Sequence, residues 1–329
     1  MDSTLRDGAN VVGKGFSAEL TELMLEGLTA CRVPIIELGN AGGLGAYEVS
    51  GATDAEKDEV YLRLVEEYAG RGSEIGMFLN ALRFRRDIVE RTGNSGLSFL
   101  RVGANAGDGP AVAVEAIRAV KDCGLKAYYS QMKAYILTPE QLAEEAAALE
   151  KEGLDEITIM DSAGTMLPEE VSAYVKALKA AVSIPVGFHG HNNLGLSVAN
   201  ALAAYQAGAD ILDCGLMGMA RSAGNTPTEV CVAVMRRLGQ MQDIDLYGML
   251  DFISGKLQPA MEKQGYHTPI TPVDLTLGMS GCHSSFLKQF RQIAAEEQVS
   301  LFALITEVSA AEKKKPTEDM IRKAAQLLK

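Results

Sequence analysis

The sequence predicts an α/β protein built as a (β/α)8 TIM barrel, followed by a small helical C-terminal domain. Short β-rich runs alternate with longer helical patterns over about the first 240 residues. Several of these runs are continuously apolar, as expected for parallel strands that are buried on both faces. Eight runs occur before the alternation ends, which is the strand number of this barrel. A doubly wound open sheet has the same alternation and is the alternative.

The expected strands are short segments bounded by glycine, proline or polar residues. They are Met1–Leu5, Val33–Leu38, Glu74–Leu79, Ser98–Val102, Lys126–Gln131, Glu156–Met160, Pro185–His189 and Asp210–Cys214. Helices are expected between them. The run Thr138–Gln141 supplies an N-cap, a proline at the first helical position and a capping-box glutamine. A second helix begins at Pro168, after which Val171, Tyr174, Val175 and Leu178 recur at helical spacing.

The pattern changes after about residue 240, where the alternation stops. Helical periodicity continues in four segments, which are Leu246–Glu262, Ser284–Glu296, Leu301–Val308 and Thr317–Leu328. A connector rich in Pro, Gly and Thr, Gly265–Gly281, separates the first segment from the second. We therefore expect a metal-dependent catalytic barrel domain at residues 1–243 and a helical domain at 244–329. A helical extension that caps the barrel is the alternative.

The composition excludes several classes of function. Lys and Arg total 31 against 43 Asp and Glu, a formal charge of -12, whereas free-standing nucleic-acid binders are usually basic. No apolar run reaches the ~18 residues that a membrane span needs, and no signal peptide is visible at the N-terminus. The five cysteines are widely spaced without a CxxC pair, which fits free thiols in a reducing cytosol. We expect a cytoplasmic protein that binds neither nucleic acid nor membrane.

Polar residues at two expected strand ends indicate a metal site. Functional side chains of a barrel come from the carboxyl ends of its strands. Arg6 and Asp7 end the first strand, where they form either a local ion pair or an anion clamp beside a hard oxygen ligand. His189 and His191 are two residues apart on a strand, so that both side chains leave the same face. Two imidazoles and one carboxylate suit Mn²⁺, Co²⁺, Fe²⁺, Mg²⁺ or Zn²⁺.

The loop after the last expected strand is the third polar strand end. Residues 215–224 are rich in glycine and small side chains, and a helix start follows at Thr226. Such a loop can hold an anion at a helix N-terminus, but glycine also serves ordinary turns. Asn225 either orients or completes the metal site or makes a plain loop contact.

Together these segments resemble the DRE-TIM metallolyases, the HMGL-like superfamily. DSTLRDG, MDSAG, GFHGHNNLG and MGMARSAGNTPTE match its signatures and span nearly the whole barrel. The superfamily includes hydroxymethylglutaryl-CoA lyase, isopropylmalate and homocitrate synthases, and 4-hydroxy-2-oxoacid aldolases. SQMKAYILTPEQLAEEAAAL and LTLGMSGCHSSFL are similar to segments of the 4-hydroxy-2-oxovalerate aldolase branch.

The resemblance implies roles for individual residues. Asp7, His189 and His191 match the ligands of a divalent metal, most often Mn²⁺, and Asn225 matches an asparagine that is a ligand in some branches. Arg6 matches the arginine that steadies the enolate of the keto acid. The aldolase branch implies cleavage of a 4-hydroxy-2-oxo acid to pyruvate and an aldehyde. It also implies a homo-oligomer and an acylating aldehyde dehydrogenase as partner.

Several residues depart from the aldolase branch. Asn10 stands where the branch has a histidine that acts as general base, and an amide cannot take a proton. His283 stands where the branch has a tyrosine, and we hypothesise that it takes over proton transfer; a surface histidine beside a helix start is the alternative. Ser162 of the DSAG turn and Asn10 are expected to contact the substrate. Lys133 and Asn40 also differ, which predicts a different substrate tail.

Two other functions fit the same motifs. A Claisen-type enzyme condensing an acyl-CoA with a 2-oxo acid belongs to the same superfamily, but such synthases usually have longer C-terminal regions. The CoA-thioester lyase has a cysteine in its glycine-rich loop, and residues 217–225 contain none. A metal-binding paralogue without catalysis is the last alternative, although it has no chemical need for Arg6 beside the three ligands.

Overall fold

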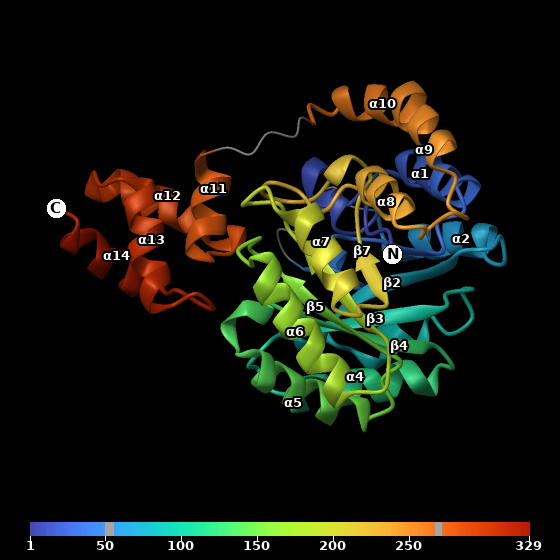
Figure 1. The fold of residues 1–329 in the computed structure, drawn as a ribbon, viewed down its shortest axis with the longest axis horizontal. Helices are drawn as coiled ribbons and strands as arrows, with labels where there is room; N and C mark the ends of the chain where they lie inside the picture. The colour runs from blue at the N-terminus through green and yellow to red at the C-terminus, as the bar shows by residue number, and fades with distance from the viewer. Residues whose placement is uncertain (50–55, 267–271) are drawn as a thin grey trace.

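Seven parallel strands form one sheet in which the strand order follows the chain (Figure 1). The computed structural model describes residues 1–49, 56–266 and 272–329. The strands are β1 (Ile35–Leu38), β2 (Glu74–Asn80), β3 (Phe99–Asn105), β4 (Lys126–Met132), β5 (Glu156–Asp161), β6 (Val186–Gly190) and β7 (Ile211–Asp213). Seven of the eight expected strands are therefore confirmed, with ends that shift by a few residues.

The segment expected as the first strand closes the barrel but is almost too short to count as a strand. Asp2 forms parallel bridges to Ile36 of β1 and to Cys214 directly after β7. The Asp2 N–H donates to Ile35 O at 2.8 Å, and the Ser3 N–H donates to Cys214 O at 2.8 Å. The predicted strand Met1–Leu5 is thus wrong in length, because the backbone turns after Ser3. The joined sheet edges confirm the barrel and contradict the doubly wound sheet.

Helices follow the strands and cover the outside of the sheet. They are α1 (Ala18–Ala30), α2 (Asp58–Tyr68), α3 (Arg86–Glu90), α4 (Ala111–Asp122), α5 (Pro139–Glu150), α6 (Pro168–Ala181), α7 (Ser197–Gln206) and α8 (Thr228–Arg237). Short 3-10 turns lie in the loops, at η1 (Gly8–Val12), η2 (Ala46–Glu48), η3 (Ala81–Arg83), η4 (Ala134–Ile136) and η5 (Leu216–Gly218). The capping box at Thr138 and Gln141 is confirmed.

The remaining helices divide between two hydrophobic clusters. Helix α9 (Leu246–Phe252), a π turn (Ile253–Leu257) and α10 (Gln258–Glu262) run as one stretch beside α1 and α8, and Met249 and Met261 belong to the barrel core. The C-terminal helices have their own core; they are α11 (Pro272–Ser280), η7 (Ser284–Phe286), α12 (Leu287–Glu297), α13 (Leu301–Ala311) and α14 (Glu318–Leu327).

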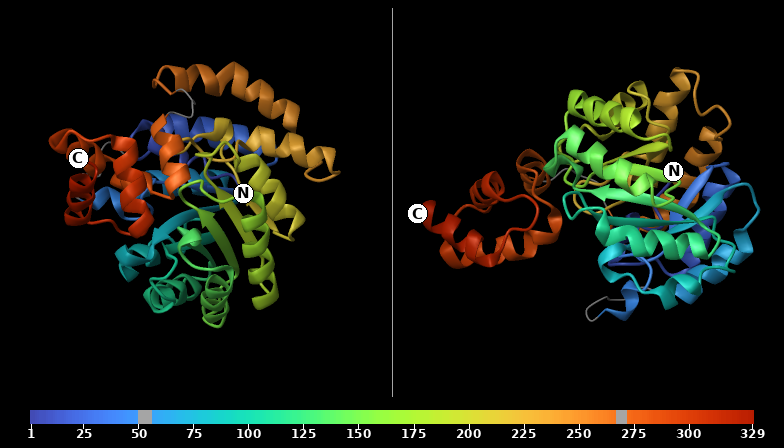
Figure 2. Two further views of the ribbon diagram at one scale, coloured as in Figure 1. Left: turned by 60° about the vertical axis from the view of Figure 1, so that its left-hand side comes forward. Right: turned by 90° about the horizontal axis from the view of Figure 1, so that it is seen from below.

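The C-terminal helices project from one end of the barrel (Figure 2). Helix α11 lies inside the connector expected at Gly265–Gly281, so that this prediction is wrong for the helical part; residues 267–271 lie outside the described residues. The domain division at residue 244 stays a prediction. The packing suggests that α9 and α10 be counted with the barrel. Within the described ranges, no helix has both the length and the apolarity to cross a membrane.

A buried arginine occupies the interior of the barrel. Arg101 of β3 is fully buried and donates from Nε and Nη2 to the two carboxylate oxygens of Glu37 on β1, both at 2.7 Å. Its Nη1 forms a close ion pair with Asp213 of β7. Strands far apart in the sequence are thereby tied across the barrel, and each of these three buried charges has a partner of opposite sign.

Replacing Arg101 by methionine would leave Glu37 and Asp213 buried without their shared cation. We expect R101M to lower the free energy of unfolding by about 3–5 kcal/mol, as measured by urea denaturation. The control is R118Q, which removes an exposed ion pair to Glu152 and should cost about 1 kcal/mol or less. An R101M protein as stable as R118Q would contradict the role of this interaction.

Candidate metal centre

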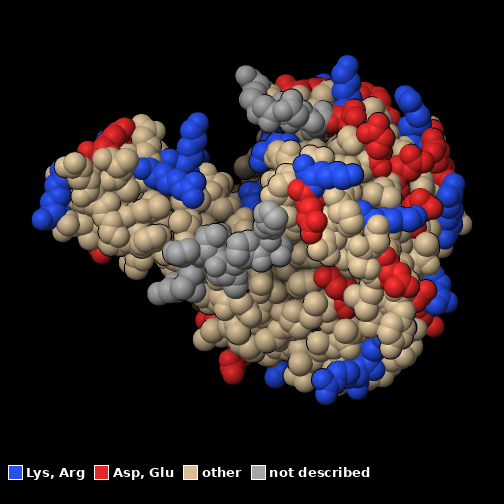
Figure 3. Space-filling model, turned by 90° about the horizontal axis from the view of Figure 1, so that it is seen from above, with Lys and Arg blue, Asp and Glu red and all other residues tan. Residues whose placement is uncertain are grey.

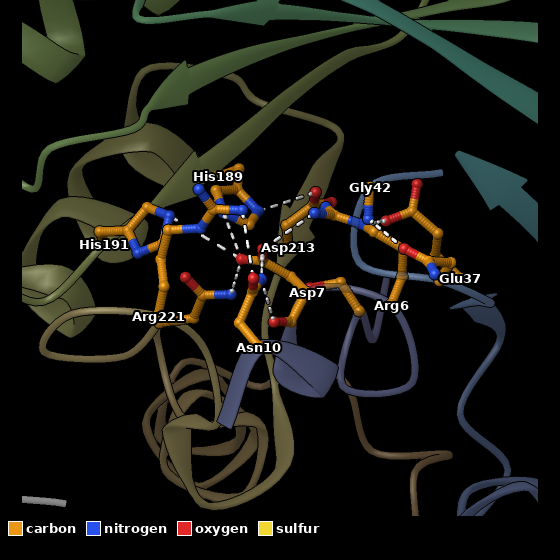
Figure 4. Close-up of polar contacts among 12 residues, drawn as sticks. Arg6, Asp7, Asn10, Glu37, Gly42, His189, His191, Asp213 and Arg221 are labelled. Atoms are coloured by element: carbon orange, nitrogen blue, oxygen red, sulfur yellow. Dashed lines mark hydrogen bonds and ion pairs between the residues drawn. The ribbon is translucent and has the colours of Figure 1, made fainter. Parts of the chain in front are cut away.

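Asp7 meets two histidines that are about 180 residues away in the sequence, at the carboxyl end of the barrel. Asp7 precedes η1, His189 lies on β6, and His191 follows that strand directly. Nε2 of His189 and Nε2 of His191 lie 3.6 Å and 3.8 Å from the same oxygen, Oδ2 of Asp7. Figure 4 shows both imidazoles pointing at this carboxylate. One ligand atom from each residue lies within 4.8 Å of the others, so the three can share one cation.

Asp213 fixes the orientation of the His189 ring on the side away from Asp7. Its Nδ1 lies 3.2 Å from Oδ2 of Asp213, and Asp213 is itself held by Arg101. Burial alone would raise the pKa of Asp213, but the Arg101 charge and the His189 hydrogen bond hold it well below its usual range. An ionised carboxylate keeps the proton of His189 on Nδ1, which leaves the Nε2 lone pair for a metal.

Asp7 is held as a carboxylate by several donors. Arg6 Nη1 donates to Oδ1 at 2.9 Å, Asn225 Nδ2 donates to Oδ2 at 2.9 Å, and Asn10 Nδ2 donates to Oδ1 at 3.2 Å. Burial would raise the pKa of Asp7, but the charge of the neighbouring Arg6 holds it well below its usual range. Burial lowers the pKa of His191 to about 3. The donor set at neutral pH is therefore one anion and a neutral imidazole at His191, which fits a divalent cation.

Arg6 has one N–H group without a hydrogen-bond partner among the described residues, and it lies beside the three metal ligands. Its Nε donates to Glu37 at 2.6 Å and its Nη1 to Asp7, while the guanidinium lies 5.2 Å from the centre of the Phe78 ring. Its Nη2 is buried and has no hydrogen-bond partner among the described residues. Arg6 also lines the cavity, so that this free N–H group is available to a ligand oxygen.

A cavity of about 510 Å³ opens beside the three ligands. Its wall includes Ser162 from the loop after β5 and both His283 and Ser285 from the C-terminal helices. The predicted residues Asn10 and Asn225 are not part of the wall but hydrogen-bond to Asp7. The structure thus gathers all the predicted site residues in one place, and the ligand role of Asn225 stays a prediction.

His283 faces the cavity in a neutral state. Burial, together with the charges of Arg221 and Lys133, lowers the pKa of His283 well below its usual value. Its Nδ1 lies 2.8 Å from Ser285 Oγ and accepts the Ser285 backbone N–H at 3.2 Å. His283 is also the half-buried N-cap of η7, as the alternative of a surface histidine beside a helix start expects. Because the ring lines the same cavity as the metal ligands, its proton-transfer role stays a prediction.

Sequence reasoning missed the charged residues that support the site. Glu37, Arg101 and Asp213 each stand in an otherwise apolar strand run, which was the available signal. Lys14, Arg83 and Arg221 also line the cavity. Lys14 and Arg83 carried no signal, because single basic residues in loops are ordinary surface residues; Arg221 lies inside the quoted segment MGMARSAGNTPTE, which was the available signal.

The fold and the site together define a TIM-barrel enzyme with a candidate divalent-metal centre. The HMGL-like family model matches residues 100–254. A 4-hydroxy-2-oxovalerate aldolase of Carboxydothermus hydrogenoformans is 34% identical over 98% of this chain and 94% of its own length. The enzyme of the same name from Thermus thermophilus is 32% identical over 100% of this chain and 94% of its own length. The chain belongs to the HMGL-like family.

Solved structures agree on the fold. The carboxyl transferase domain of Rhizobium etli pyruvate carboxylase superposes with a TM-score of 0.78 at 15% identity, covering 100% of this chain and 60% of that one. The N-terminal domain of a Bacteroides vulgatus protein superposes with a TM-score of 0.74 at 20% identity, covering 88% and 95%. Both are similar to this chain in architecture.

His191→Ala removes one of the two imidazoles that face Asp7. We expect its Mn²⁺ affinity to fall by roughly 100-fold or more, because even the partners behind metal ligands are worth about 10–100-fold. Titration calorimetry on metal-free protein measures this affinity. The matched control is H283Q, which changes a histidine of the same cavity outside the donor set and should bind Mn²⁺ like the wild type. Equal affinity of H191A and H283Q would contradict the site.

Proposed function

We propose that the protein is a metal-dependent aldolase that cleaves or forms the C–C bond between pyruvate and an aldehyde. The substrate is a 4-hydroxy-2-oxo acid. The observation that carries this proposal is the free Nη2 of Arg6 beside the Asp7, His189 and His191 donor set. Such a donor stabilises an enolate oxygen. The curated relatives named as 4-hydroxy-2-oxovalerate aldolases support the same chemistry.

Asp7, His189 and His191 would hold the divalent metal. When bound, the metal supplies a Lewis acid for the 2-oxo and carboxylate oxygens of the substrate. Arg6 donates to the oxygen on which negative charge develops as the C–C bond breaks, and its Nε and Nη1 contacts keep it from moving. Ser162 Oγ accepts the Lys133 backbone N–H at 2.9 Å, which leaves its own hydroxyl hydrogen for the substrate carboxylate.

His283 is the proposed proton acceptor, acting through Ser285. Because Nδ1 of His283 faces Ser285 Oγ at 2.8 Å and both residues line the cavity, the serine hydroxyl can take the 4-hydroxyl proton while passing its own to the imidazole. The lowered pKa of His283 leaves Nδ1 unprotonated at neutral pH, but it also makes the ring a weaker base than an ordinary histidine. Asn10, where the branch has its base, hydrogen-bonds to Asp7 instead.

Further properties belong to the same proposal. Mn²⁺ is the metal we propose; the mixed imidazole and carboxylate donors accept Mg²⁺, Co²⁺, Fe²⁺ or Zn²⁺ as well. The cytoplasmic location is proposed from the free thiols. A homo-oligomer, and an acylating aldehyde dehydrogenase that receives the aldehyde, are proposed from the family resemblance alone. The C-terminal helices would be the docking surface for that dehydrogenase.

Two reactions separate the proposed roles of Arg6 and His283. Aldol cleavage needs both an enolate and the removal of a hydroxyl proton, whereas decarboxylation of oxaloacetate forms the same enolate without that proton transfer. With Mn²⁺, we expect H283Q to lower kcat for cleavage by roughly 10²–10⁴-fold and to spare decarboxylation. We expect R6K to lower both by roughly 10²–10³-fold. Spectrophotometric assays of pyruvate release measure both reactions.

Three outcomes would contradict the proposal. Equal loss of both reactions in H283Q would remove the proton-transfer role of His283. Turnover of acyl-CoA with a 2-oxo acid, but not of pyruvate with aldehydes, would favour the Claisen-type alternative. If the Mn²⁺-loaded wild type neither decarboxylated oxaloacetate nor exchanged the methyl protons of pyruvate with deuterium, a non-catalytic paralogue would remain.

A further inference from the structure

The mouth of the cavity carries more positive charge than the proposed reaction uses. Lys14 follows η1, Arg83 ends η3 after β2, and Arg221 lies between β7 and α8, and all three line the cavity. Lys133, after β4, is a fourth cation in the wall. Asp7 is the one carboxylate among the described wall residues, and it is committed to Arg6 and the two histidines.

Two of these cations converge on one neutral acceptor. Lys14 Nζ lies 3.4 Å and Arg221 Nη2 lies 3.3 Å from the same oxygen, Oδ1 of Asn10. The other end of that amide donates to Asp7. An asparagine thus joins the metal ligand to a pair of cations. A protonated histidine at this position would be repelled by both, so the residue that departs from the branch suits a positive mouth.

These cations lack the carboxylate partners that several arginines on the outer surface have. Arg85, Arg118 and Arg322 on the outer surface pair with Asp87, Glu152 and Glu318. Within the described residues, by contrast, Lys14, Arg83 and Arg221 have no carboxylate within ion-pair distance, and Arg83 donates to the Gly42 carbonyl.

Lys133 repeats this pattern on the other side of the cavity. Its Nζ donates to the Lys314 carbonyl at 2.9 Å, while the nearby Asp108 is paired with Lys314 at 2.5 Å. Figure 3 shows basic side chains at the barrel edge of the hollow between barrel and C-terminal helices, on a surface that is otherwise mixed in charge. A chain with a net charge of -12 therefore concentrates unpaired positive charge at one cavity, which raises the local concentration of anions.

We propose that the aldehyde handled at this site carries its own anionic group, a carboxylate or a phosphate, which Lys14, Arg83 and Arg221 bind. This inference rests on the proposed aldolase function. Pyruvate alone does not explain the three cations, since its carboxylate already has the metal site and Ser162. The C–C bond joins the pyruvate methyl carbon to the aldehyde carbon, the methyl proton ends on the new 4-hydroxyl, and the anionic tail takes no part in the bond changes.

Matched aldehydes test the proposal in the Mn²⁺-loaded wild type. Succinic semialdehyde and butanal have the same chain length and differ in a terminal carboxylate. Glyceraldehyde 3-phosphate and glyceraldehyde differ in a phosphate. We expect kcat/KM for the anionic member of at least one pair to be roughly 10–100-fold higher, as for one charge-assisted contact. The pair with the larger ratio identifies the anion. Ratios near one in both pairs would overturn the proposal.

Substitutions test whether the cations that line the cavity cause the preference for anionic aldehydes. K14M should lower the ratio of kcat/KM for the better anionic aldehyde to that of its neutral match by about tenfold, and R83M should act in the same direction. The control is K151M, which removes one exposed positive charge beyond the end of α5 and should keep the wild-type ratio. If this ratio fell equally in K14M and K151M, the preference would come from the net charge of the protein, and the proposed subsite would be wrong.

Binding distinguishes a failure of this inference from a failure of the aldolase proposal. Calorimetry compares 2-oxoglutarate with 2-oxopentanoate, which share the 2-oxo acid head and differ in the distal carboxylate. Tighter binding of 2-oxoglutarate that K14M weakens would support the cationic subsite even if no aldol product formed. Equal binding of the two acids by a protein that decarboxylates oxaloacetate would leave the aldolase intact and overturn the anionic tail.

Discussion

The pairing of Arg101 with two carboxylates inside the barrel is the interaction on which the site depends. Each carboxylate has a second task at the carboxyl end of the sheet. Glu37 accepts from Arg6, the residue with the free donor, and Asp213 faces Nδ1 of His189. One buried guanidinium therefore aligns both the proposed enolate-stabilising group and a proposed metal ligand. Such a buried arrangement is costly to leave incomplete, which ties the geometry of the chemistry to the stability of the core.

The same arrangement accounts for the balance of charge around the proposed metal. The charge of Arg6 holds Asp7 ionised despite its burial. The positive mouth begins immediately beyond, at Asn10, whose amide separates the carboxylate from Lys14 and Arg221. A substrate with negative charge at both ends would find a cationic group for each end. Asn10, which the family resemblance places where the aldolase branch has a histidine, joins these two parts of the site.

Most strands and the metal-ligand residues could be predicted from the sequence, because they depend on local sequence patterns. Continuous apolar runs gave seven strands, and the His189-x-His191 spacing placed both imidazoles on one face. The shortened first strand could not be predicted, since the turn after Ser3 depends on contacts with β1 and with Cys214. The ion pairs of Arg101 could not be predicted either, because their partners lie 64 and 112 residues away in the sequence. Helix α11 could not be predicted, because the glycine, proline and threonine of its segment favour a connector.

The cavity wall is shared between two separately packed cores. The metal ligands belong to the barrel, whereas His283 and Ser285 belong to the C-terminal helices, whose apolar residues form a cluster of their own. Mutations inside that smaller cluster can therefore tilt one wall without touching the opposite one. Evolution along this line would diversify which compounds are accepted while the bond-breaking apparatus stays constant, so that relatives of similar architecture need not consume similar metabolites.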